Sequence, residues 1–245
     1  MSSGYYAACT GMASRTEALD TIANNLANVS TPGFRGSHNV FKAVLATAGE
    51  SPLSVLNQDA NDYGVLGGTR LDTTQGALVR TNNDLDLAVE GPGYFAVQTA
   101  SGVQYTRGGN LRVSPQKQLI TAAGDPVLGD NGPITVAGQP VSISTDGTIS
   151  VNGAISGRLK MFEFAPSVPL QSAGGTYYTA PAGTAVPAKA SQVRQGMLES
   201  SNVNPITSVV ELISAQREVE SMRRALSMFN NEIDKTAAQE LPRVG

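Results

Sequence analysis

The sequence has no tryptophan, one cysteine and one histidine among its 245 residues. Cys9 cannot form a disulfide within the chain, and a thiolate metal site needs several cysteines. His38 stands without a neighbouring nucleophile or metal motif, which leaves zinc and haem chemistry little support. We therefore expect no cofactor and no metal, and nothing in the sequence assembles the active site of an enzyme.

The chain also has no excess of positive charge and no long apolar run. Charged residues make up 15% of the sequence and the net charge is −3, so electrostatics gives no reason to expect a nucleic-acid partner. No run of eighteen apolar residues exists, so we expect no membrane insertion. The first nine residues contain neither a basic segment nor an apolar one, and we expect no cleaved signal peptide.

Glycine is abundant, with 26 residues, and it accompanies strand patterns in the middle of the chain. Apolar residues alternate over 141–143 and 149–151 on either side of Asp146-Gly147, which predicts a β-hairpin. A second turn is predicted at Gly91, Gly93, Tyr94 and Phe95. This segment matches a dinucleotide-binding pattern, but that motif must open a helix, whereas Tyr94-Phe95 is typical of a strand.

Both ends of the chain carry a seven-residue apolar repeat, which is typical of helices that pack along a narrow seam. The predicted assembly positions of the N-terminal helix are Tyr5, Met12, Leu19, Ile22, Leu26 and Val29. Those of the C-terminal helix are Leu212, Ala215, Val219, Met222, Leu226, Phe229 and Ile233. Pro32 is expected to stop the first helix, and Asn204-Pro205 to start the second.

These patterns predict an α+β chain with four parts. Residues 1–35 and 196–245 form the helices of a coiled-coil-like axial domain, and residues 81–195 form an inserted, hairpin-rich all-β domain. Residues 36–80 form an extended connector, with a short helix over 40–48. Because one partner helix covers a narrow seam only in part, we expect the chain to self-assemble.

Four segments resemble the sequence blocks of bacterial flagellar rod and hook proteins. The segment 22–35 is similar to their N-terminal signature, and 85–97, 105–111 and 195–204 are similar to the next three blocks, in the same order. The signature residues are Ala23, Asn24, Asn25, Leu26, Ala27, Asn28, Thr31, Pro32, Gly33 and Phe34. The chain looks most like the proximal-rod member, with the distal-rod member as the alternative.

The resemblance implies a subunit of a drive shaft in the periplasm, in the rod of the flagellar basal body. It also implies export through the flagellar type III apparatus without a cleaved signal peptide. Other rod proteins would be its partners, together with the rings around the shaft. Two interpretations from other classes stay open, a β-rich surface binding module with helical arms and a periplasmic enzyme.

Two further expectations concern the end of the first helix. The side-chain amides of Asn24, Asn25 and Asn28 fall off the predicted seam, where they would hydrogen-bond to neighbouring subunits or to each other, or form a solvated face. Phe34 follows Pro32-Gly33, and we expect it to be buried where the chain leaves the helix.

Overall fold

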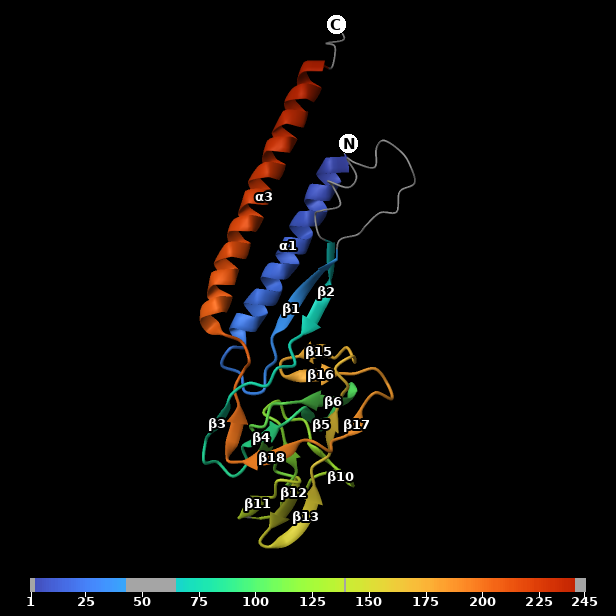
Figure 1. The fold of residues 1–245 in the computed structure, drawn as a ribbon, viewed down its shortest axis with the longest axis vertical. Coiled ribbons are helices and arrows are strands. Elements are labelled where there is room, and N and C mark those ends of the chain that lie inside the picture. The colour runs from blue at the N-terminus through green and yellow to red at the C-terminus, as the bar shows by residue number, and fades with distance from the viewer. Residues whose placement is uncertain (1–2, 43–64, 139, 241–245) are drawn as a thin grey trace. The chain divides into compact units, whose positions relative to one another are not determined.

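The computed structural model describes residues 3–42, 65–138 and 140–240, and it describes side chains over 9–40, 68–138 and 140–228. It shows an N-terminal helix, a β-rich middle and a C-terminal helix (Figure 1), so the predicted α+β class is confirmed. The described residues divide into two compact units. Unit 1 takes its residues from 1–26, 37–69 and 205–245, and unit 2 from 27–36 and 70–204.

Unit 1 consists of helix α1 (Ser3–Ala27), helix α3 (Pro205–Glu240) and a two-stranded ladder of β1 (Ser37–Lys42) and β2 (Val65–Leu71). The last two residues of β2 belong to unit 2. The two helices run in opposite directions (Figure 1). Within the described residues, no helix combines the length and the hydropathy that a membrane span requires. The helix predicted over residues 40–48 is wrong at its start, because Val40 lies in β1, a strand that pairs with β2. Residues 43–48 lie outside the described part of the chain.

The helix boundaries follow local sequence. Helix α3 begins at Pro205 as predicted. Helix α1 ends at Ala27, and a turn follows in which the backbone N–H and the hydroxyl of Thr31 donate to the backbone and side-chain oxygens of Asn28. Val29 therefore lies in this turn, and its prediction as a helical seam position is corrected.

Unit 2 is built of short strands. Their bounds are β3 Leu78–Arg80, β4 Leu87–Glu90, β5 Gly93–Thr99, β6 Gly102–Thr106, β7 Arg112–Val113, β8 Leu119–Ile120, β9 Leu128–Gly129, β10 Gly132–Pro133, β11 Val141–Ile143, β12 Thr148–Val151, β13 Ala154–Arg158, β14 Met161–Glu163, β15 Gln171–Gly174, β16 Tyr177–Thr179, β17 Val186–Pro187, β18 Gln192–Gln195 and β19 Met197–Glu199. The largest sheet has the order β15-β16-β6-β5-β14-β17, and β11-β12-β13 form a second one. The remaining strands pair as β10-β9, β18-β4, β19-β3 and β7-β8, and these pairings of unit 2 are antiparallel.

The predicted hairpin is confirmed. Strands β11 and β12 pair with Val141 opposite Val151 and Ile143 opposite Ile149, and Gly147 takes the positive φ of +84° that the turn needs. The alternating apolar residues point into the core of unit 2, where Ile149 is fully buried. The second predicted turn is present at Gly91-Pro92, but Gly93, Tyr94 and Phe95, which were predicted with it, already lie in strand β5. A strand therefore follows where a dinucleotide motif would need a helix.

Candidate assembly faces and a buried charge cluster

Helix α3 has one partly covered face. Five predicted seam residues lie on it and are half-buried: Leu212, Ala215, Val219, Met222 and Leu226. Every other residue from Val209 to Met228 is exposed. The side chains of Phe229 and Ile233 lie outside the described residues. The burial pattern thus has the predicted seven-residue period, and the role of these residues in assembly stays a prediction.

Helix α1 presents two neighbouring stripes. Its most buried residues are small or polar ones at heptad spacing: Gly11, Ser14, Ala18 and Asn25. Its larger predicted seam residues are half-buried: Met12, Leu19, Ile22 and Leu26. The side chain of Tyr5 lies outside the described residues. The short side chains therefore occupy the inner stripe, and the large apolar ones keep part of their surface in solvent.

The first two turns of α3 expose a further apolar patch. Ile206 is 77% exposed, Val209 42% and Ile213 45%. At about 100° per residue these three side chains lie on roughly the opposite side of the helix from Glu211, Ala215 and Glu218. Apolar surface is therefore left uncovered on two sides of α3.

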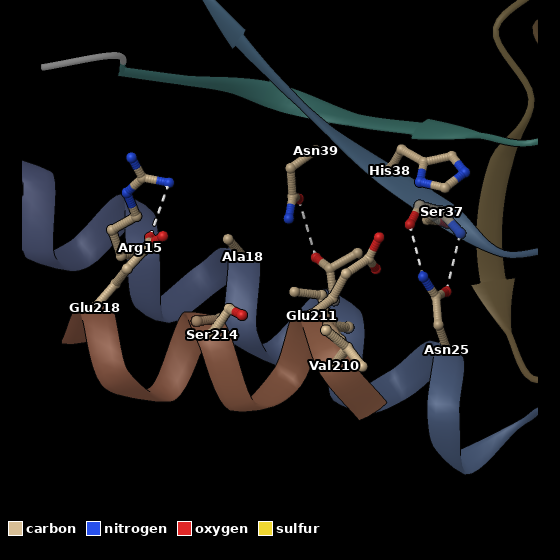
Figure 2. A pocket seen from close by; sticks show the side chains of 13 residues that line it. Arg15, Ala18, Asn25, Ser37, His38, Asn39, Val210, Glu211, Ser214 and Glu218 are labelled. Atoms are coloured by element: carbon tan, nitrogen blue, oxygen red, sulfur yellow. Dashed lines mark hydrogen bonds and ion pairs between the residues drawn. The ribbon is translucent and has the colours of Figure 1, made fainter. Parts of the chain in front are cut away.

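A hollow of about 380 Å³ lies between α1, β1 and α3 (Figure 2). Arg15 of α1 and Glu218 of α3 approach at its edge, with 3.2 Å between Nη1 and Oε2. Both side chains are about half exposed, so this ion pair contributes little to stability. The hollow has polar and apolar walls, and among the described residues no group of three His, Cys, Asp or Glu is placed to hold a metal.

Asn25 fixes β1 to α1 at the other end of this hollow. Its Nδ2 donates to the backbone oxygen of Ser37 over 2.8 Å, and the Ser37 N–H donates to its Oδ1 over 2.9 Å (Figure 2). Thr21 donates to Asn39 one turn earlier. The expectation that Asn25 binds a neighbouring subunit is therefore corrected, because both ends of its amide are engaged within the chain. Asn24 is exposed, and Asn28 accepts a bond from Thr31.

Three charged side chains of unit 2 form a buried cluster that sequence reasoning missed. Arg35 Nη2 lies 2.7 Å from Glu199 Oε1, and Arg107 Nη1 lies 3.1 Å from Glu199 Oε2. All three side chains are at most 2% exposed. The Gly76 N–H also donates to Glu199 Oε1, over 2.9 Å. Glu199 thus holds together segments that are far apart in the sequence.

The two arginines are satisfied to different degrees. Arg107 also donates to the backbone oxygens of Val89 and Gly91, and its guanidinium lies 4.7 Å from the centre of the Tyr94 ring. Burial lowers the pKa of Arg107 and raises that of Tyr94, and in each case the neighbouring opposite charge opposes the change. Arg35 Nε and Nη1 have no hydrogen-bond partner among the described residues. Two cations therefore share one carboxylate.

The backbone on either side of Arg35 is fixed as well. Phe34 is 4% exposed, so its predicted burial is confirmed. The N–H of Arg35 donates to the Tyr178 hydroxyl over 2.9 Å, and burial raises the pKa of that phenol. Gly33 has a φ of +74°, and a Cβ there would lie 2.3 Å from the carbonyl carbon of Arg107. Only glycine fits this close approach.

The four segments that carry the family resemblance converge on this cluster. Residues 33–36, 89–94, 106–108 and 199–202 supply its side chains and carbonyl groups. The signal in the sequence was a single charged residue inside each of three otherwise uncharged motifs. Sequence reasoning had treated the motifs as turns and helix ends.

Family models match three parts of the chain. The flagella basal body rod protein model matches residues 6–35, and the flagellar hook protein FlgE/F/G D1 domain model matches residues 88–151. The model of the C-terminal region of flagellar basal body rod FlgEFG proteins matches residues 194–239. The matched segments include most of α1, strands of unit 2 and most of α3.

Relatives match over nearly their whole length. The flagellar basal-body rod protein FlgF of Caulobacter vibrioides is 34% identical over 233 residues, which cover 92% of each chain. FlgF of Salmonella typhimurium is 34% identical over 247 residues, with 93% of this chain and 95% of the relative covered. FlgG of Bacillus subtilis is 31% identical over 246 residues, with 91% and 93% covered. The chain therefore belongs to the flagellar basal-body rod protein family.

Proposed function

We propose that this chain is a structural subunit of the proximal rod of the bacterial flagellum. It polymerises through α1 and α3, which pair in a coiled-coil-like manner, into a drive shaft that transmits torque across the periplasm. Its partners are further copies of itself and other rod proteins. The proposal includes contact with the surrounding rings, and export by the flagellar apparatus without a cleaved signal peptide.

The observation that carries this proposal is the half-covered seam of α3. The seam residues have the period of a helix that packs along other helices, yet no residue of this stripe between 212 and 226 is fully buried. The patch at Ile206, Val209 and Ile213 is left exposed as well. Fully burying a large apolar side chain stabilises a protein by about 1.5–3 kcal/mol, so neighbouring helices would gain considerably by covering both surfaces.

A charged substitution in the seam tests the proposal. Val219→Asp places a carboxylate where a neighbouring helix would pack, and we expect the chain to fold unit 2 but to fail to restore motility to a strain that lacks its own proximal-rod protein. Ser221→Asp is the matched control, since it adds the same charge two residues away at an exposed position. Normal motility with Val219→Asp would refute the assembly role of the seam.

The distal rod is the second candidate, and the similarity to FlgG of Bacillus subtilis supports it. Complementation separates the two, because the wild-type chain should restore motility to a strain without its proximal-rod protein and not to one without its distal-rod protein. The reverse result would assign the chain to the distal rod. The surface binding module and the enzyme find no supporting observation in the described residues.

A further inference from the structure

Three segments of unit 2 meet at Asn202. The Gly36 N–H donates to Asn202 Oδ1 over 2.8 Å, and Asn202 Nδ2 donates to the backbone oxygens of Asp72 and Thr74, each over 3.1 Å. The Asp72 N–H in turn donates to the Gly36 oxygen over 2.8 Å. One side-chain amide therefore links residues near 36, near 72 and near 202.

Glu199 joins the same three segments a few residues away. Its backbone oxygen accepts from the Gly33 N–H over 2.7 Å, while its carboxylate accepts from the Gly76 N–H and pairs with Arg35. The approach is tight, since a Cβ on Gly76 would lie 1.9 Å from the Ser200 oxygen. The three segments are thus linked both at Glu199 and at Asn202, the two ends of the segment 199–202.

We infer that Glu199 and Asn202 lock residues 33–36, 72–76 and 199–202 into one clasp that opens and closes as a single cooperative unit. Each segment forms hydrogen bonds with the other two, so none of the three can detach without breaking hydrogen bonds to both of the others. The buried guanidinium of Arg35 adds to this coupling, because it would lose its carboxylate partner inside the protein if Glu199 withdrew.

The clasp has a consequence for the order of folding. Residues 33–36 directly follow the turn after α1, but their partners Glu199 and Asn202 lie more than 160 residues later in the chain. A chain whose residues 199–202 have not docked leaves the N-terminal signature segment open. Unit 2 therefore closes around this segment only when the C-terminal segment arrives, and this holds for the unassembled protein whatever its role.

Native-state hydrogen exchange on the full chain tests the clasp. The reporters are the N–H groups of Gly33, Gly36, Asp72 and Gly76. In Asn202→Asp, which replaces the amide donor by a carboxylate oxygen, we expect all four to exchange at least tenfold faster and by a similar factor. The amides of β5 and β6 should keep their wild-type rates. Asn131→Asp is the control, because it makes the same chemical change at an exposed turn residue.

The pattern of rates decides the outcome. If Gly36 and Asp72 accelerate while Gly33 and Gly76 keep their wild-type rates, the contacts are independent and the clasp is refuted. Unchanged rates at all four positions would refute it equally. Should Asn202→Asp prevent folding, Asn202→Ser provides the milder change. It removes the amide without adding a charge, and we expect the same four amides to accelerate together.

Discussion

At the scale of single residues, unit 2 depends on side chains that are costly to bury. Arg35, Arg107 and Glu199 carry a net charge of one inside the protein, and their geometry must compensate for the lost hydration. Glu199 is the common partner of both arginines, so replacing Glu199 should lower the free energy of unfolding more than replacing Arg35.

Glu199→Gln leaves two buried guanidinium groups without a counter-charge. We expect a loss of about 3–5 kcal/mol in the free energy of unfolding of unit 2, the usual result of removing one partner of a buried ion pair. Arg35→Met leaves the neutral pair of Glu199 and Arg107 in place, and its loss should be clearly smaller. Urea denaturation followed by tyrosine fluorescence measures both; equal losses would show that Glu199 does not bridge the two arginines.

Gly33 is required for two separate reasons, its positive φ and its contact with the backbone of Arg107. Gly33→Ala should therefore destabilise unit 2 by about 2–6 kcal/mol, from strain and overpacking together. Gly183 has a similar φ of +79° but open space where a Cβ would lie, so Gly183→Ala should cost only about 1–2 kcal/mol. Denaturation midpoints of the two variants compare the costs, and equal values would contradict the close approach at Gly33.

Sequence reasoning found the glycines, the turn and the burial of Phe34, but not the charge cluster. Turn residues and apolar positions reveal themselves in local sequence, because their backbone geometry or spacing is local. Arg35 and Arg107 have their common partner at position 199, far from both in the sequence, and a lone charged residue ordinarily indicates solvent exposure. Only the three-dimensional structure shows that they are buried together.

At the scale of elements, local patterns predicted the helices and the β11–β12 hairpin. Helix α3 follows from Pro205 and its heptads, and the hairpin from Asp146-Gly147. Strand β1 was missed because it pairs with β2, whose first residue is 23 positions beyond the end of β1. Non-local pairing leaves a weak sequence signal, and the packing of β1 on α1 through Asn25 leaves none that could be recognised in advance.

The link between β16 and the 121–125 turn gives unit 2 a pH-dependent contact. The hydroxyls of Tyr177 and Thr121 lie 2.6 Å apart, and burial, the largest cause, raises the pKa of Tyr177 to about 12. In the unfolded chain tyrosine ionises near pH 10. The contribution of Tyr177 to stability is therefore complete below about pH 10 and is lost between about pH 10 and 12.

Tyr177→Phe removes this titration. We expect the free energy of unfolding of the variant to decline less steeply between pH 10 and 12 than that of the wild type, while some decline remains because burial also raises the pKa values of Tyr94 and Tyr178. Urea denaturation at half-unit pH intervals measures the slopes. Equal slopes for the two proteins would show that Tyr177 ionises in the folded state as it does in the unfolded state.

At the scale of the whole molecule, the two units have different sources of stability. Unit 2 has a closed apolar core with many fully buried side chains. Unit 1 has two long helices, whose larger described apolar seam side chains are at best half-buried. Ordering a residue costs about 1–2 kcal/mol of backbone entropy, and half-buried side chains recover only part of this. We therefore expect the stability of the two helices to depend on neighbouring subunits more than the stability of unit 2 does.

Circular dichroism of the dilute, unassembled chain tests this difference. The structure has 25 residues in α1 and 36 in α3, and we expect the signal at 222 nm to correspond to clearly fewer helical residues. The near-ultraviolet signal of the tyrosines in unit 2 should stay native, and removing residues 1–26 and 205–245 should change it little, since the clasp at 33–36 is kept. Raising the concentration until the chain assembles should restore the helical signal by mass action. A dilute monomer with the full helical signal, lost on truncation, would mean that α1 and α3 stabilise each other without a polymer.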